Sequence, residues 1–166
     1  MDLKLFILIS FIIGFISDII LYILATNKFT SAKGTLSQNT KNIINSLSPY
    51  FNHYKILSPF LAGITVVVGT LVSYGILLTI YPKLDDIDKP MPQGVKQDLN
   101  ISTLSVYIII LFLFGILLDY LINITGIFRP YLNKYYKKAG LLSILFGGIA
   151  NLIVGIPAYF ISRQSF

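Results

Sequence analysis

Four long apolar runs dominate the sequence and leave little chain between them. The runs are Leu3–Ala25, Ile56–Tyr81, Leu104–Ile127 and Leu141–Ile161. Each reaches the length of about 17–25 residues that a helix needs to cross the hydrocarbon core of a bilayer. Only 12% of the 166 residues are charged, which is too few to cover the surface of a soluble domain of this size. The predicted fold class is therefore an all-α polytopic membrane protein with four transmembrane helices and no separate soluble domain.

The first run starts so close to Met1 that a cleaved signal peptide is the alternative to a retained helix. The apolar region of a signal peptide spans about 7–15 residues and ends at a cleavage site formed by small residues. This run continues to Ala25 without such a site. The pattern therefore favours a retained transmembrane helix.

Three short blocks of the sequence each have a similar counterpart later in the chain, and the counterparts follow in the same order. The pairs are Phe11-Ile-Ile-Gly-Phe-Ile-Ser-Asp18 with Phe112-Leu-Phe-Gly-Ile-Leu-Leu-Asp119, Pro49-Tyr-Phe-Asn-His-Tyr54 with Pro130-Tyr-Leu-Asn-Lys-Tyr135, and Ala62-Gly-Ile-Thr65 with Gly147-Gly-Ile-Ala150. This order favours a tandem duplication of a helical hairpin over chance similarity between apolar segments. Two helices per unit return the chain to its starting side, so the copies would be related by a pseudo-two-fold axis along the membrane normal.

The predicted organisation has three parts. The first hairpin occupies residues 1–81, with helices at 3–25 and 56–81 and a basic loop at 26–55. An acidic connection containing proline follows at 82–103. The second hairpin occupies residues 104–166, with helices at 104–127 and 141–161 and a short basic turn between them. Apolar residues at helical spacing between Ile43 and Phe51 predict a short amphipathic surface helix in the first loop, with an ordinary loop as the alternative. We expect Asn39 or Thr40 to cap it and Pro49 to end or kink it.

Asp18 and Asp119 are the feature with the clearest functional meaning. A carboxylate near the middle of a transmembrane helix raises the free energy of membrane insertion by about 2.5–3.5 kcal/mol. Two aspartates at matching positions therefore indicate a functional or structural role. Each lies four residues after a glycine, on the same helix face, and should face protein or a cavity rather than lipid. With Asn151 and Thr65 they form the predicted intramembrane polar group. The pair relays protons or cations, bonds to neighbouring helices through Thr65, Ser73, Asn123 or Asn151, or contacts water or lipid headgroups near the interface.

Glycines are concentrated in the predicted spans. Those expected to mark close helix packing are Gly14, Gly63, Gly69, Gly75, Gly115, Gly147, Gly148 and Gly155. Small residues allow two helix backbones to approach within a membrane. Close approach of a ligand is the alternative reading.

The basic residues gather in the two hairpin turns. The first turn carries Lys28, Lys33, Lys41 and Lys55, the second carries Arg129, Lys134, Lys137 and Lys138, and the opposite side carries Lys4, Lys83, Lys89, Lys96 and Arg163. The excess of basic residues predicts cytoplasmic turns, with both termini on the other side. With the tyrosines around them, the turns suit anionic lipid headgroups. The predicted partners are the bilayer and, beyond it, a second copy or a membrane-associated protein, but no nucleic acid.

Catalysis has no support in the sequence. There is no cysteine, and the only histidine is His53, which we expect at the membrane interface. Without a nucleophile–base spacing or a metal-ligand cluster, we predict no enzyme activity, no cofactor and no metal.

Gly14-Phe-Ile-Ser-Asp18, Pro49-Tyr-Phe-Asn-His-Tyr54 and Ala62-Gly-Ile-Thr-Val-Val-Val-Gly69 together resemble small hydrophobic four-helix membrane proteins of nucleocytoplasmic large DNA viruses. The resemblance covers most of the chain and implies a host-derived or virion internal membrane. The chain is also similar to the peroxisomal and mitochondrial four-helix family of proposed pores. In this resemblance, Ser17-Asp18 corresponds to a Gly-Asp pair of that family. Its last helix has polar and proline positions to which Asn151, Pro157 and Arg163 correspond. The chain departs from that family in lacking tryptophan and the glutamine after the aspartate.

Two functions follow from these features. The first is a structural role, in which the basic turns organise or dock a membrane. The alternative is a small channel or proton-coupled transporter that uses the paired aspartates.

Overall fold

The computed structural model describes residues 2–26, 37–81 and 101–163, and this part of the chain is helical without a strand. The helices are α1 (Leu3–Thr26), α3 (Gln38–Asn45), α4 (Ser48–Tyr54), α5 (Leu57–Ile80), α7 (Ile101–Thr125), α8 (Arg129–Ala139) and α9 (Leu141–Arg163). Four of them, α1, α5, α7 and α9, are long and apolar enough to cross a membrane. The prediction of an all-α chain with four apolar helices is confirmed and supports an integral membrane location. The acidic connection predicted at 82–103 lies mostly outside the described residues.

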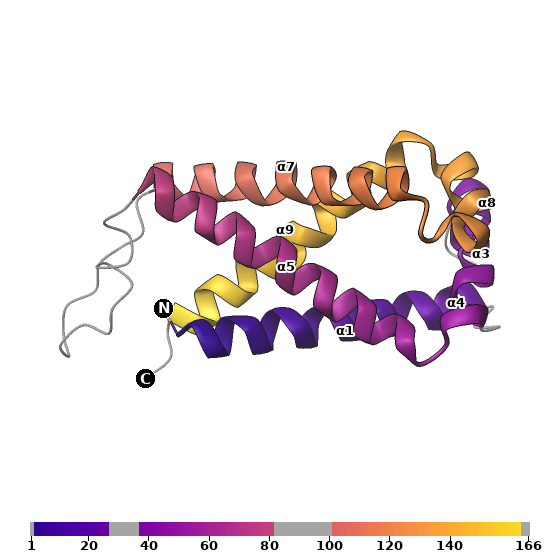
Figure 1. Ribbon diagram of the computed structural model, residues 1–166, viewed down its shortest axis with the longest axis horizontal. Coiled ribbons are helices and arrows are strands. Elements are labelled where there is room, and N and C mark those ends of the chain that lie inside the picture. The colour runs from indigo at the N-terminus through magenta and orange to yellow at the C-terminus, as the bar shows by residue number, and fades with distance from the viewer. Residues whose placement is uncertain (1, 27–36, 82–100, 164–166) are drawn as a thin grey trace.

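The four long helices form a bundle in which α1 and α7 lie on opposite sides (Figure 1). Helix α1 packs mainly on α5, and α7 mainly on α9; α1 also packs on α9, and α5 on α7. Figure 1 shows α5 lying along α1 at the end that carries α4 and approaching α7 at the other end, while α9 crosses in the opposite sense. At the end that carries α4, α1 lies beside α5 and α7 beside α9, so the two hairpins form separate layers. At the other end, α1 lies beside α9 and α5 beside α7.

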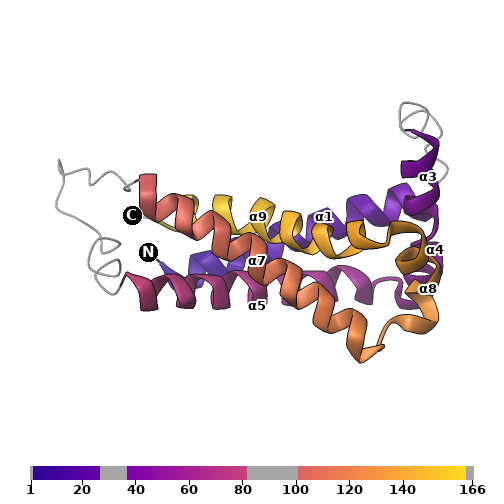
Figure 2. The same ribbon diagram turned by 90° about the horizontal axis from the view of Figure 1, so that it is seen from above.

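The short helices α3, α4 and α8 lie together at one end of the bundle, called here the turn end (Figures 1 and 2). The start of α1 and the end of α9 lie at the other, the terminal end, where the backbone N–H of Asp2 donates to the carbonyl of Ser162 at 3.1 Å. Both hairpin turns therefore lie at one end of the bundle, as expected if all four long helices cross a membrane. Which end faces the cytoplasm stays a prediction.

The turns contain more helix than the sequence indicated. The surface helix exists as α3, but its cap is Ser37, whose side chain accepts from the backbone N–H of Thr40, and neither Asn39 nor Thr40 is the capping residue. Pro49 does not end this helix; it lies in the first turn of the next one, α4. Pro130 has the same place in α8, which replaces the predicted short turn. A proline at the start of a helix loses no hydrogen bond, because the first N–H groups have no partner within the helix.

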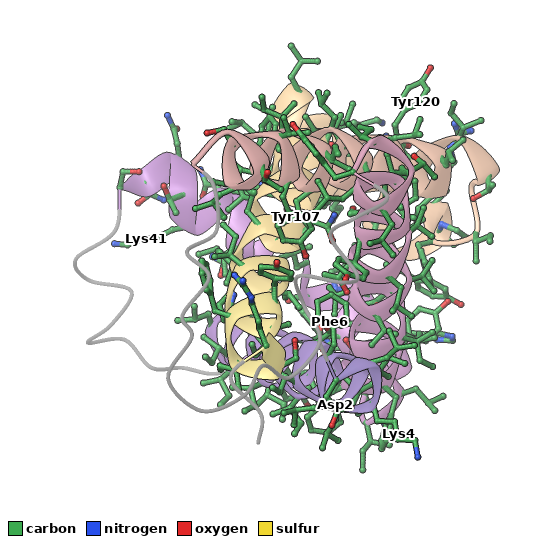
Figure 3. The ribbon with its side chains drawn as sticks, turned by 90° about the vertical axis from the view of Figure 1, so that its left-hand side faces the viewer. Asp2, Lys4, Phe6, Lys41, Tyr107 and Tyr120 are labelled. Carbon is green, nitrogen blue, oxygen red and sulfur yellow. The ribbon has the colours of Figure 1, made fainter. Side chains whose placement is uncertain are left out.

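An aromatic layer fills the centre of the bundle towards the terminal end. Its buried members are four aromatic residues, Phe6, Tyr74, Tyr107 and Tyr159, and three aliphatic residues, Leu77, Leu111 and Ala158. The rings of Tyr107 and Tyr159 lie 5.3 Å apart, and the Tyr107 hydroxyl donates to the Gly155 carbonyl at 3.3 Å. Figure 3 shows Phe6 and Tyr107 pointing towards the bundle centre, whereas Lys4 and Tyr120 point away from it. Side chains from all four long helices thus close the bundle at this level.

Glycines allow the helices of each hairpin to approach closely. At seven of the eight glycines that we expected to mark helix packing, an added Cβ would lie less than 3.0 Å from a neighbouring atom. The prediction is wrong for Gly75, where an added Cβ would have no atom within 4 Å. At Gly63 that atom belongs to Phe11, and at Gly148 it belongs to Phe112. At Gly115 it is the carbonyl oxygen of Gly147, at 2.4 Å, so backbone meets backbone there.

Gly115→Ala should lower stability by about 1–3 kcal/mol, the usual cost of overpacking against atoms that cannot move aside. The matched control is Gly75→Ala, because Gly75 also lies within a helix but has no atom within 4 Å of the added Cβ. This control should be neutral or stabilising by up to about 1 kcal/mol, the helix propensity of alanine over glycine. Thermal unfolding in detergent micelles, followed by circular dichroism, measures both. Equal effects of the two substitutions would contradict the packing described for α7 and α9.

Candidate functional site

A cavity of about 280 Å³ lies between the two hairpins, on the turn-end side of the aromatic layer. It is bounded by α5 on one side and by α7 and α9 on the other, with α4 and α8 closing it at the turn end. Its polar lining residues are Tyr50, Thr65, Asp119, Tyr135, Tyr136, Ser143 and Asn151. No lysine, arginine or histidine from the described segments lines it, so Asp119 is the one side chain there that carries a charge when ionised at neutral pH.

Asp119 is half-buried on α7, beside α9. An added Cβ at Gly147 would lie 2.5 Å from the Cβ of Asp119, so the glycine provides the space that the aspartate occupies. Among the described residues, no hydrogen bond to the Asp119 carboxyl group is found. Its carboxyl group is therefore open to a partner from outside the chain.

Asp18 has a different environment. It is 8% exposed and lies between α1 and α5, where the Ser58 hydroxyl donates to its Oδ2 atom at 2.6 Å. It does not line the cavity. The bonding partner is thus a residue of the neighbouring helix, but not one of the four that the sequence analysis had considered.

Asn151 joins three helices at the inner end of the cavity. Its Nδ2 atom donates to the Leu111 carbonyl of α7 at 2.7 Å and to the Ser73 hydroxyl of α5 at 3.3 Å. Gly69 leaves room for it, because an added Cβ there would lie 2.7 Å from the Asn151 Oδ1 atom. Thr65 instead donates to the Leu61 carbonyl of its own helix. The cavity therefore brings Asp119, Asn151 and Thr65 together and leaves Asp18 apart.

An aromatic cluster joins α4 to α8 at the turn end, and two of its members, Tyr50 and Phe128, line the cavity. The His53 and Tyr131 rings stack at 4.0 Å, and the Tyr50 and Tyr54 rings meet the Phe128 ring edge-on at 5.5 and 5.6 Å. Each edge-on pair contributes about 0.5–1.5 kcal/mol beyond its buried area. His53 is exposed at the turn end and forms part of this cluster. The stacking fixes α8 against α4.

The phenols that line the cavity remain neutral. Burial raises the pKa of Tyr50 and of Tyr136 to about 12 each, and burial also raises the pKa of Tyr135. At neutral pH these hydroxyls are therefore uncharged donors and acceptors. They lie outside the long apolar helices, at the turn end of the cavity.

The two hairpins use the same pairs of positions for their closest contacts. Gly14 approaches Ala62 and Gly63, as Gly115 approaches Gly147. Ser58 lies four residues before Ala62, and Ser143 lies four residues before Gly147. Both serines are buried, but the Ser143 hydroxyl donates to the Gly140 carbonyl at 2.7 Å and not to an aspartate. Neither serine was predicted from the sequence, although both stand at the same distance before the matching glycine blocks, which was a usable signal.

The basic residues of α8 form a surface at the turn end. Lys134, Lys137 and Lys138 are exposed and share one helix face by their spacing. Lys134 and Lys138 also line a groove of about 510 Å³ with the polar residues Asn45, Ser46 and Asn52. We call these three lysines the basic face.

In the described segments, no group of three histidine or acidic side chains is arranged to hold a metal ion. Comparisons with family models, with curated proteins and with solved structures find no match to this chain. The resemblances to viral and to pore proteins therefore stay predictions.

Ser58→Ala should lower stability by about 1–3 kcal/mol, because it leaves the buried Asp18 carboxyl group without its donor. Ser143→Ala is the matched control, since its hydroxyl bonds only a carbonyl of its own turn, and it should cost less. Thermal unfolding in micelles compares the two. If Ser143→Ala lowers stability as much as Ser58→Ala does, the hydrogen bond between Ser58 and Asp18 contributes nothing beyond the loss of a buried serine hydroxyl.

Proposed function

We propose that the protein is a structural membrane protein that docks an adjacent anionic surface through its turn end. The observation that supports this most directly is the charge at that end. The described residues there include six cations and no acid, namely Lys41, Lys55, Arg129, Lys134, Lys137 and Lys138. Anionic lipid surfaces attract such clusters by about 1 kcal/mol for each basic residue.

The shape of the turn end supports the same role. Helix α8 presents the basic face outward while Tyr131, Leu132, Tyr135 and Tyr136 are half-buried on its other side. Because α8 is held against α4 by stacked rings, the lysines project from a fixed support. The groove beside Lys134 and Lys138 is also lined by the exposed Asn52, whose side-chain amide can donate to a headgroup phosphate.

We further propose that the chain arose by tandem duplication, with the hairpins related by a pseudo-two-fold axis along the membrane normal. The matched contacts of Gly14 and Gly115, and of Phe11 and Phe112, support this. So do the positive-φ residues Lys55 and Gly140, which stand just before the second helix of each hairpin. A duplication of this kind places both basic turns on the same side, which we propose is the cytoplasmic one.

A small channel or proton-coupled transporter is the second candidate, and the cavity beside Asp119 favours it. The pairing of two aspartates has less support, because Asp18 is bonded to Ser58 and does not line that cavity, although the lining residue Tyr50 interacts with both Asp18 and Ser58. A path through this conformation would also have to cross the aromatic layer. We therefore rank transport below docking.

Reversing the basic face with Lys134→Glu, Lys137→Glu and Lys138→Glu together should weaken binding to anionic membranes by about a hundredfold or more. The full chain is placed in phosphatidylcholine nanodiscs, which leave both ends accessible. Binding to immobilised vesicles containing phosphatidylserine is then measured at low and physiological salt. Wild-type binding should weaken as salt rises, because exposed charges are screened.

The control for this experiment reverses charge at the terminal end with Lys4→Glu and Arg163→Glu, which should change binding little. Vesicles of phosphatidylcholine alone should bind neither protein. If the two charge reversals weaken binding equally, the turn end is not a docking surface and the proposal fails.

A further inference from the structure

We propose that the cavity between the hairpins binds an amphiphilic amine, whose ammonium group pairs with Asp119 and whose apolar body lies between α5 and α7. This goes beyond the docking role and does not depend on it. The lysines of the basic face do not line the cavity. The two sites can therefore be tested separately.

The two aspartates have contrasting environments. Asp18 receives a hydroxyl donor from Ser58 and is nearly enclosed by protein. Asp119 has no such bond within the described residues, because the serine at the matching place, Ser143, donates to a backbone carbonyl. A carboxyl group at this depth is costly unless a partner or water satisfies it. The cavity beside it provides the space for such a partner.

The lining determines the chemistry of that partner. Asp119 accepts hydrogen bonds when ionised, and no cation of the described residues lines the cavity to neutralise it. An ammonium group supplies both the charge and the donors. The rings of Phe128 and Tyr136 lie in the same lining, and aromatic faces attract cations.

The remaining lining determines the rest of the ligand. Its walls include Leu61, Val66, Leu118, Ile122 and Leu132, which favour a hydrocarbon body over a hydrated metal ion. A volume of about 280 Å³ corresponds to about nine water molecules at about 30 Å³ each, so the ligand is small. An amine on a short alkyl chain fits this description. It could come free from solution or as the amine headgroup of a bilayer lipid.

The test uses the full chain in phosphatidylcholine nanodiscs and radiolabelled octylamine as the probe. Equilibrium dialysis measures uptake, with protein-free nanodiscs subtracted. Wild type should bind octylamine, and Asp119→Asn should weaken that binding by about thirtyfold or more. Asp18→Asn is the matched control and should bind within about twofold of wild type, because Asp18 lies outside the cavity. The triple lysine reversal should likewise bind normally.

Two further arms need no substitution. Octanol, which has the same chain without the charge, should show no uptake above protein-free nanodiscs. Nanodiscs that include phosphatidylethanolamine identify the source: reduced octylamine uptake assigns the site to the lipid headgroup, and unchanged uptake assigns it to a free amine. The proposal is overturned if wild type binds no octylamine, if octanol binds as well as octylamine, or if the two aspartate variants lose binding equally.

Discussion

Polar side chains inside this bundle have no bulk water to bond with, and their hydrogen bonds determine where the helices meet. In a bilayer, apolar contacts between helices compete with equally apolar lipid chains, so burial of leucine alone does not select one arrangement. Here the Asn151 amide bonds to both α5 and α7, Ser58 bonds to Asp18, and the Thr70 hydroxyl of α5 donates to Ser10 of α1 at 3.2 Å. Each bond fixes the rotation of one helix against another. Many of the other large apolar side chains, such as Ile20 and Leu113, are exposed on the outside of the bundle.

The glycines and the aromatic layer divide the bundle into two unlike halves. Towards the turn end, Gly14 and Gly115 hold each hairpin tightly together. Helices that are close within a hairpin and crossed between hairpins leave space between the layers, and the cavity occupies that space. Towards the terminal end, Tyr107 and Tyr159 fill the corresponding volume. The cavity is thus a consequence of where small and large residues are placed along the same four helices.

Much of this fold could be predicted from the sequence, because hydrophobic length is a strong signal. The four long helices begin and end within three residues of their predicted bounds. The contacts of the site were harder to predict, since these helices are apolar on all sides and a periodic pattern identifies no inner face. Ser58 was missed for that reason, although Asp18 itself was identified as important. Pro49 was misread because a proline near an apolar segment can begin a helix as well as end one.

Helix α8 links the two surfaces that carry the functional proposals. Its exposed side carries Lys134, Lys137 and Lys138, and its half-buried side contributes Tyr135 and Tyr136 to the cavity. Because these side chains lie on one helix of eleven residues, any displacement of α8 that moves the lysines also moves both tyrosines relative to Asp119. The stack of His53 on Tyr131 resists such a shift, because separating the rings would expose both faces. The docking surface and the binding cavity that we propose can therefore act independently while this aromatic contact holds.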